Sequence, residues 1–291
     1  MDLDKLSLMK EKFSSLPPDK AKEFLHLTSE IKDAKNCEDS RKSFMSFVGT
    51  VWPSFIEGRH HKVMAESFEK IANGEIKRLI INMPPRHTKS EFASYLLPAW
   101  FLGKYPGKKI IQTAHTAELA TGFGRKVRNL FQDEIFKKIF PNVSLRSDSK
   151  AAGRWNTNKG GDYFSIGVGG AVTGKGADLL IIDDPHSEQD AQAGAYNPEV
   201  FDRVYEWYTS GPRQRLQPGG AICIVMTRWH KRDLTGQILK SAIQRSGADE
   251  WEIIQFPALM PSGSPLWPEF WSEKELMALK NELPIPKWQA Q

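Results

Sequence analysis

The chain has 291 residues, enough for one large domain or for one domain with a smaller subdomain. Its composition, 40% hydrophobic and 26% charged, is that of an ordinary globular protein and excludes a disordered chain. The formal net charge of +5 is a modest basic excess, which is compatible with a nucleic-acid partner without requiring one.

Targeting and redox features are few. Cys37 and Cys223 lie far apart and outside any Cys/His cluster, so we expect two reduced thiols and no structural zinc. Residues 1–13 mix charges and have no apolar core, which excludes a signal peptide. No apolar run approaches the roughly 20 residues needed to span a bilayer. The sequence therefore predicts a cytoplasmic protein with no membrane partner.

The first 50 residues or so are predicted to form a helical lid or arm. Apolar residues recur there at roughly helical spacing, in two runs that Pro17-Pro18 separates. The first run consists of Leu3, Leu6, Leu8 and Phe13, and the second of Phe24, Leu27 and Ile31.

From about residue 77 the pattern changes to alternating strands and helices. Apolar runs without helical periodicity predict strands at 78–82, 109–114, 163–167, 179–182, 221–226 and 251–256. Helices are predicted from Ser90 to about Leu97, where Pro98 ends or kinks the helix, and over 117–140, 198–208 and 233–243. The alternation predicts an α/β fold with a mainly parallel sheet that helices cover on both faces.

A nucleotide site is indicated in IINMPPRHTKSE at 80–91, where a strand leads into a tight loop and a helix. A triphosphate needs backbone N–H groups around its phosphates, a cation between the β and γ positions and a hydroxyl on Mg²⁺. Lys89 and Ser90 occupy the last two positions of G-x-x-x-x-G-K-[ST], but Met83 and Thr88 replace its glycines. Alone, this match is weak, because a Lys-Ser pair often begins a helix by chance.

Two further motifs lie at strand ends. LLIIDDP at 179–185 is an apolar strand ending in two carboxylates, which places Asp183 toward Mg²⁺ and Asp184 toward an attacking water. An ordinary Asp-Asp-Pro turn is the alternative. VMTRWH at 225–230 puts Thr227 and Arg228 at the carboxyl end of another strand, where open α/β sheets bind ligands. Together the motifs predict a P-loop ATPase.

In this order, MPPRHTKSE, GGAVTGKGADLLIIDDPH and IVMTRWHKRDLTG closely resemble the ATPase half of bacteriophage large terminases. The resemblance implies an ATPase, with ATP and Mg²⁺ as cofactors, that drives double-stranded DNA into a procapsid. It divides the chain into an N-terminal helical lid or arm (1–50), a P-loop ATPase core (51–260) and an irregular C-terminal segment (261–291). Because the chain ends where the linker to a nuclease domain would begin, we expect no nuclease activity.

The resemblance also implies roles for single residues. Lys89 would bind the β- and γ-phosphates, Ser90 and Asp183 would hold Mg²⁺, and Asp184 would activate water where relatives usually carry Glu. Arg86 would contact the γ-phosphate, and Thr227 would couple hydrolysis to movement. The residues expected around the nucleotide are Pro85, Arg86, His87, Thr88, Lys89, Ser90 and, for the adenine, His61. A buried or surface role is the alternative for His61.

Many relatives carry an arginine that acts on a neighbouring subunit's ATP. Lys175 is at the corresponding place in this chain, although lysine lacks the planar fork of arginine. Arg154 and Arg228 are the other candidates for a trans-acting finger. The alternative for the glycine-rich run at 167–176 is a flexible surface loop.

The partners implied by the resemblance are duplex DNA, a portal protein, a small terminase subunit and further copies of this chain in a ring. The assembly would dock transiently on the procapsid in the host cytoplasm. DNA contacts are expected to phosphates, with the candidates Arg125, Lys126, Arg128, Arg213 and Arg215. Another P-loop DNA translocase or helicase is one alternative, and a non-hydrolysing ATP-binding assembly module is another.

Overall fold

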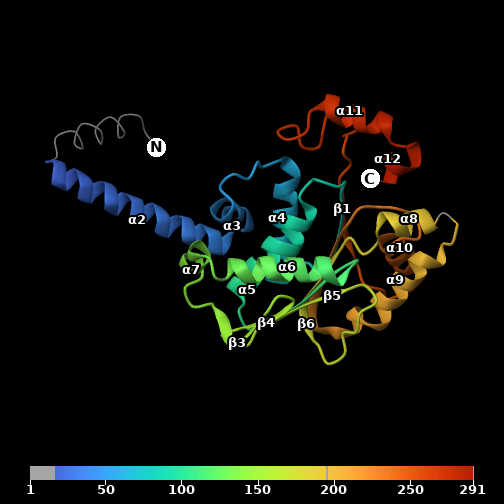
Figure 1. The fold of residues 1–291 in the computed structure, drawn as a ribbon, viewed down its shortest axis with the longest axis horizontal. Coiled ribbons are helices and arrows are strands. Elements are labelled where there is room, and N and C mark those ends of the chain that lie inside the picture. The colour runs from blue at the N-terminus through green and yellow to red at the C-terminus, as the bar shows by residue number, and fades with distance from the viewer. Residues whose placement is uncertain (1–16, 195, 291) are drawn as a thin grey trace.

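The computed structural model describes residues 17–194 and 196–290, so the predicted helical run over residues 3–13 lies outside the described residues. An eight-stranded sheet with helices on both faces forms the body of the molecule (Figure 1). This arrangement confirms the predicted α/β fold with a mainly parallel sheet. Within the described ranges, no helix combines the length and the apolarity needed to cross a bilayer.

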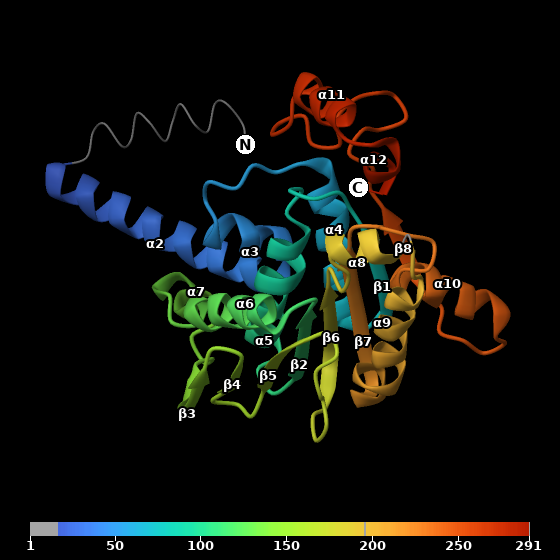
Figure 2. The ribbon, with the colours of Figure 1, turned by 45° about the vertical axis from the view of Figure 1, so that its right-hand side comes forward.

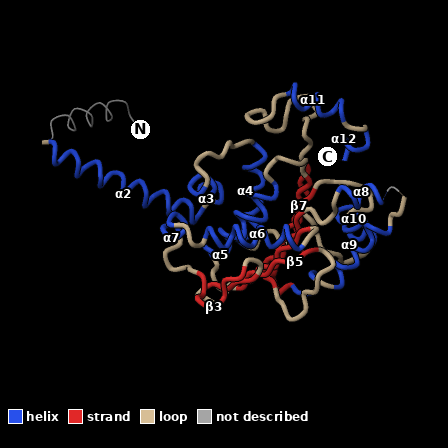
Figure 3. The backbone as a smooth tube through the Cα atoms, in the orientation of Figure 1, coloured by secondary structure: helices blue, strands red, loops and turns tan. Residues whose placement is uncertain are grey.

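The strand order is β3-β4-β5-β2-β6-β7-β1-β8. Neighbours from β5 to β8 are parallel, whereas β3 and β4 add an antiparallel edge beside β5 (Figure 3). Because β7 lies between β1 and β6, the carboxyl ends of these three strands are adjacent. The strands are β1 (Arg78–Asn82), β2 (Lys109–Ala114), β3 (Leu145–Ala151), β4 (Arg154–Thr157), β5 (Asp162–Gly167), β6 (Ala177–Asp183), β7 (Leu216–Met226) and β8 (Glu252–Gln255).

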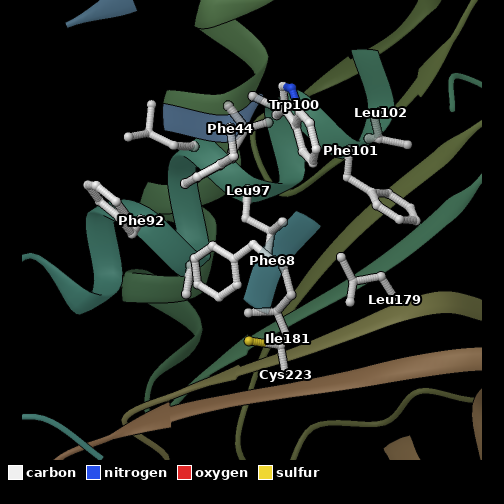
Figure 4. Close-up of a cluster of buried hydrophobic side chains, with 14 of the residues drawn as sticks. Phe44, Phe68, Phe92, Leu97, Trp100, Phe101, Leu102, Leu179, Ile181 and Cys223 are labelled. Carbon is white, nitrogen blue, oxygen red and sulfur yellow. The ribbon is translucent and has the colours of Figure 1, made fainter. Parts of the chain in front are cut away.

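Alternate side chains of the central strands enter two separate cores. Leu179 and Ile181 of β6 point into the larger core, beside Cys223 of β7 (Figure 4). Leu180 and Ile182 point into the smaller core on the other face. Burial on both faces explains why these strands are continuous apolar runs rather than alternating ones.

Helices cover the two faces unequally. The larger core packs under α3 (Phe44–Val51), α4 (Arg59–Asn73), the π-helix η1 (Glu91–Leu96), α5 (Leu97–Lys104), α6 (Ala117–Leu130) and α7 (Glu134–Ile139). The other face carries α9 (Glu199–Ser210), the 3₁₀ turn η2 (Pro212–Arg215) and α10 (Leu234–Gln244), on the right in Figure 2. The remaining helices are α2 (Pro18–Lys42), α8 (Glu188–Gly194), α11 (Glu273–Glu282) and α12 (Ile285–Ala290).

The helical N-terminal segment joins the body at its C-terminal end. α2 projects outward (Figure 1), and the indole of Trp100 donates to the Ser40 carbonyl at 2.9 Å where α2 meets the body. The following α3 belongs to the larger core, because Phe44 and Phe47 are fully buried. The division at residue 50 stays a prediction, although α3 packs as part of the body.

The predicted helix at 90–97 does not stop at Pro98. It continues as η1 and α5 to Lys104, and Pro98 lies in the first turn of α5. The Leu97 N–H bonds the carbonyl of Phe92, five residues earlier, so a π-helical turn precedes the proline. This wider turn carries the helix past a residue that has no N–H and that crowds the preceding turn.

Three other segments differ from expectation. The helix predicted over 117–140 is broken into α6 and α7, because the Asp133 carboxylate accepts the Ile135 N–H at 2.9 Å and starts a new helix. The edge strands β3 and β4 were not predicted, since β3 is largely exposed and has no apolar run. The tail, predicted to be irregular, contains α11 and α12.

We expect Phe44→Ala to lower the free energy of unfolding by about 3–5 kcal/mol. Phe44 is fully buried, and its ring makes edge contacts with Phe68, Phe92 and Trp100 at 5.4–5.6 Å between centroids. Ile31→Ala on the exposed part of α2 is the control, with an expected change within about 0.5 kcal/mol. Denaturant unfolding measures both; equal small losses would show that α3 is a separable arm.

Candidate nucleotide-binding site

The loop between β1 and the next helix has a strained backbone at positions without glycine. Thr88 stands where the phosphate-loop pattern has its second glycine, and its φ is 65°. Arg86, two residues earlier, has a φ of 62°. This left-handed region costs a residue with a side chain roughly 1–2 kcal/mol. The loop therefore needs contacts that hold this conformation.

His61 supplies such a contact from α4. The Gly58 N–H donates to His61 Nδ1 at 2.8 Å, so the neutral ring carries its proton on Nε2 and donates to Thr88 Oγ1 at 2.6 Å. Burial lowers the pKa of His61 to about 2, which keeps the ring neutral. Both nitrogens are thus used within the protein. The predicted adenine contact would require the ring to give up one of these bonds.

Asp183 lies at the bottom of the site and accepts two hydroxyl hydrogen bonds. Ser90 Oγ donates to Oδ1 at 2.9 Å, and Ser94 Oγ donates to Oδ2 at 2.7 Å. Burial, followed by the charge of Asp184, raises the pKa of Asp183 to about 7, while Lys89 and the two hydroxyls lower it. Ser94, which the motifs did not single out, receives a hydrogen bond from Gln112 Nε2 at 2.8 Å.

Asp184 connects the loop to the end of β7. Its Oδ2 lies 2.8 Å from Lys89 Nζ, and its Oδ1 accepts the Thr227 N–H at 2.8 Å. The backbone at Asp184 has a φ of 38°, which turns its side chain out of the strand line. The structure therefore brings together four predicted residues: Lys89, Asp183, Asp184 and Thr227.

A cavity of about 730 Å³ opens over these groups at the carboxyl edge of the sheet. Pro85, Lys89, Ser90 and the two aspartates line it, and α8 and α6 form its other walls. The adjacent Ser90 hydroxyl and Asp183 carboxylate are hard oxygen donors that fit Mg²⁺, which keeps several waters besides its protein ligands. No group of three His, Cys, Asp or Glu suited to a metal exists elsewhere in the described ranges.

His87 and Arg86 point away from this cavity. His87 is buried, with Nδ1 2.8 Å from the Pro85 carbonyl and its ring stacked on Trp271. Arg86 is exposed and lines a second, largely aromatic pocket of about 280 Å³. The γ-phosphate contact predicted for Arg86 therefore needs its side chain to turn toward the larger cavity. The sequence analysis missed the aromatic lining: Trp52, Phe55, Trp267 and Phe270.

The three finger candidates lie in different surroundings. Lys175 Nζ is 2.8 Å from Asp162 Oδ2 at the amino end of β5, away from this chain's own cavity. Arg228 Nε is 2.8 Å from the fully buried Asp233, so it holds the loop before α10. Arg154 is exposed on β4, near the edge of the sheet. A role for any of them on a neighbouring subunit stays a prediction.

Several of the DNA candidates are engaged within the chain. Lys126 Nζ lies 2.6 Å from Glu91, and Arg128 donates to the Lys150 carbonyl at 2.9 Å. Arg213 pairs with Asp249 at 2.8 Å. These contacts fit a structural role on the protein surface, so the candidates do not form one free basic face.

Neither a family model nor a curated protein matches the sequence. Among solved structures, the crystal structure of the HK97 bacteriophage large terminase aligns with a TM-score of 0.52 and 12% identity, over 81% of this chain and 49% of that chain. The chain has the large terminase fold. The ATPase domain of the Thermus phage P74-26 large terminase aligns with a TM-score of 0.43 and 15% identity, over 74% and 86% of the two chains. A large terminase from a thermophilic bacteriophage, solved with ATP-gamma-S, gives 0.45 and 9%, over 77% and 50%.

The HK97 likeness confirms, at the level of the fold, the resemblance that the three sequence motifs predicted. At 12% identity the likeness concerns the fold alone, and this chain spans about half the length of the HK97 protein. Substrate, partners and residue roles must therefore be argued from the geometry of the site.

We expect stability to be constant above about pH 7 and to fall as the pH drops below about 6.5. Burial lowers the pKa of His60 to about 4 and that of His61 to about 2, so the unfolded chain binds protons first. Each histidine contributes about 1.4 kcal/mol per pH unit between its unfolded and folded pKa. Denaturant unfolding from pH 8 to pH 5 measures this slope.

His60→Phe provides the matched comparison, because neither nitrogen of the buried His60 ring has a hydrogen-bond partner among the described residues. The variant should be as stable as wild type at pH 8 and should show a shallower decline toward pH 5. An unchanged slope would contradict the assignment of the titration to this ring.

Proposed function

We propose that this chain is an ATPase that drives double-stranded DNA into a viral procapsid. The observation that carries the ATPase is the convergence in one cavity of two contacts between the loop and β6. These are the Ser90–Asp183 hydrogen bond, which spans 93 residues of sequence, and the Lys89–Asp184 ion pair. The large terminase fold supports the part of the proposal that concerns DNA packaging.

In this proposal Ser90 and Asp183 hold Mg²⁺, and Lys89 binds the β- and γ-phosphates. The bound Mg²⁺ would neutralise charge on the phosphate oxygens. Ser94 fixes the second oxygen of Asp183, so that the carboxylate presents a defined edge to the cavity. Catalysis then consists mainly of charge stabilisation and the positioning of water.

Lys89 and Asp184 would exchange partners when the nucleotide binds. The ammonium group now lies 2.8 Å from Asp184 Oδ2, and a triphosphate is the stronger competitor for it. Once Lys89 turns to the phosphates, Asp184 Oδ2 is free to accept a hydrogen bond from the attacking water and then its proton. The Thr227 N–H holds the other oxygen of Asp184, so the change is felt at the end of β7.

We propose that the base lies in the aromatic pocket rather than against His61. This pocket adjoins Thr88 and offers flat apolar faces from Trp52 and Phe55. Its position beside the loop would also place Arg86 near the bound nucleotide. His61 would then support the site through Thr88.

The assembly follows from the proposed packaging role. A ring of this chain would dock on the portal protein of a procapsid in the host cytoplasm, together with a small terminase subunit. A strand-displacement assay separates this proposal from a helicase, because a packaging motor moves an intact duplex. Release of phosphate from ATP separates it from a non-hydrolysing assembly module.

We expect Lys89→Ala to reduce ATP turnover by at least about 100-fold, because it removes a charge aimed at the transferring phosphate. Lys108→Ala is the matched control, since it removes a lysine from an ion pair with Asp178 on the far side of the sheet. Phosphate release measures both variants, and thermal unfolding checks their folding. Full turnover in a folded Lys89→Ala variant would sink the ATPase proposal.

Ser94→Ala should raise the Mg²⁺ concentration needed for half-maximal turnover by about tenfold or more, since Asp183 loses a buried donor worth about 1.5–3 kcal/mol. Ser165→Ala is the control, because Ser165 bonds only a backbone carbonyl, that of Gly153, at 3.1 Å. A titration of turnover against Mg²⁺ decides; a Ser94→Ala curve that overlays wild type would remove Ser94 from the site.

A further inference from the structure

We infer that the surface between α9 and α10 binds the phosphate backbone of duplex DNA, an inference that rests on the proposed function and names its DNA surface. A hollow of about 610 Å³ lies between these helices. Its charged lining consists of Lys231, Arg232, Lys240 and Arg245, with Asp202 as the single acid. None of these basic residues was among the DNA candidates suggested by the sequence.

Three of the four cations are available to a ligand. Lys231, Lys240 and Arg245 are exposed, and their side chains make no hydrogen bond or ion pair within the described ranges. The fourth, Arg232, pairs with Asp202. Arg245 also borders a neighbouring hollow, where Asp249 is shared between Arg78 and Arg213 at 2.8 Å from each.

The positive charge of this surface is concentrated and uncompensated. Residues 228–245 contain five lysines and arginines and one acid, Asp233, in a chain whose net charge is only +5. Asp233 is fully buried, bonds Arg228 and caps α10, so its charge does not reach the hollow. Glu206 and Glu250 are the nearest other acids in sequence, and neither lines this hollow.

Helix stability does not explain these cations. Lys231 and Arg232 directly precede the N-cap Asp233, where positive charge opposes the helix dipole. α10 has 11 residues, about 16 Å in length, so the cations at its two ends are too far apart for one phosphate. A polyanion with regularly spaced charges satisfies both groups. Gln237 and Ser241 between them are further donors for phosphate oxygens.

The hollow is also connected to the proposed site of hydrolysis. Thr227, whose N–H bonds Asp184, is separated from α10 by the short loop of residues 228–233 (Figure 2). The buried Asp233 fixes this loop by accepting the N–H groups of Trp229 and His230 at 3.0 and 3.3 Å. A change at Asp184 therefore reaches α10 through a rigid connection. This link favours DNA, the cargo of the proposed motor, over an acidic protein.

The test compares two triple variants that each remove three positive charges. The first is Lys231→Gln with Lys240→Gln and Arg245→Gln. The control is Lys138→Gln with Lys150→Gln and Lys159→Gln, which are exposed on α7, on β3 and beside β4, at the opposite end of the sheet. Fluorescence anisotropy measures affinity for a labelled duplex over a range of salt, and phosphate release without DNA is measured in parallel.

We expect the α10 variant to bind the duplex at least about tenfold more weakly than wild type. Its plot of log affinity against log salt should be shallower by about 2.7, or 0.9 for each lost phosphate contact. The control should match wild type. Equal affinities and slopes for the two variants, or wild-type binding that polyglutamate reproduces and duplex DNA does not, would overturn the assignment. Loss of phosphate release from all proteins, with the DNA result intact, would instead refute the ATPase and leave the surface standing.

Discussion

Asp183 and Asp184, at the carboxyl end of β6, join three segments that are distant in sequence. Asp183 receives Ser90 and Ser94 from the helix after β1, and Asp184 receives the Lys89 ammonium group and the Thr227 N–H. Burial alone would neutralise Asp183, and these donors, with Lys89, oppose that tendency. The geometry of the cavity depends on this arrangement, because without it the loop, β6 and β7 would have no polar contact at their ends.

The strained loop is stabilised from outside the nucleotide cavity. Thr88 adopts a left-handed backbone without being glycine, and the Gly58–His61–Thr88 hydrogen bonds hold it there. His61 can do so because it is buried, neutral and packed against Phe92 and Trp267. A glycine-poor loop thus acquires rigidity from α4 that a glycine-rich loop obtains from its own backbone freedom.

The sheet separates the proposed chemistry from the proposed DNA surface while linking them mechanically. The larger core fixes the loop and η1 on one face, and α9 and α10 pack on the other. β7 lies between β1 and β6 and continues through Thr227 toward α10. Because packed β-sheets and helices move as units, a shift at one strand end is transmitted to the basic surface rather than absorbed.

Local sequence determined the elements that have strong local signals. The six apolar strands, the loop with Lys89 and Ser90, and the acidic pair could be predicted because each follows from a short run of residues. Tertiary structure decided what depends on contacts between distant residues. It placed Ser94 and Gln112 behind Asp183, turned His61 toward Thr88, directed Arg86 to an aromatic pocket and gathered the cations of α10. Burial and hydrogen-bond partners set these positions, and neither is encoded in the spacing of a motif.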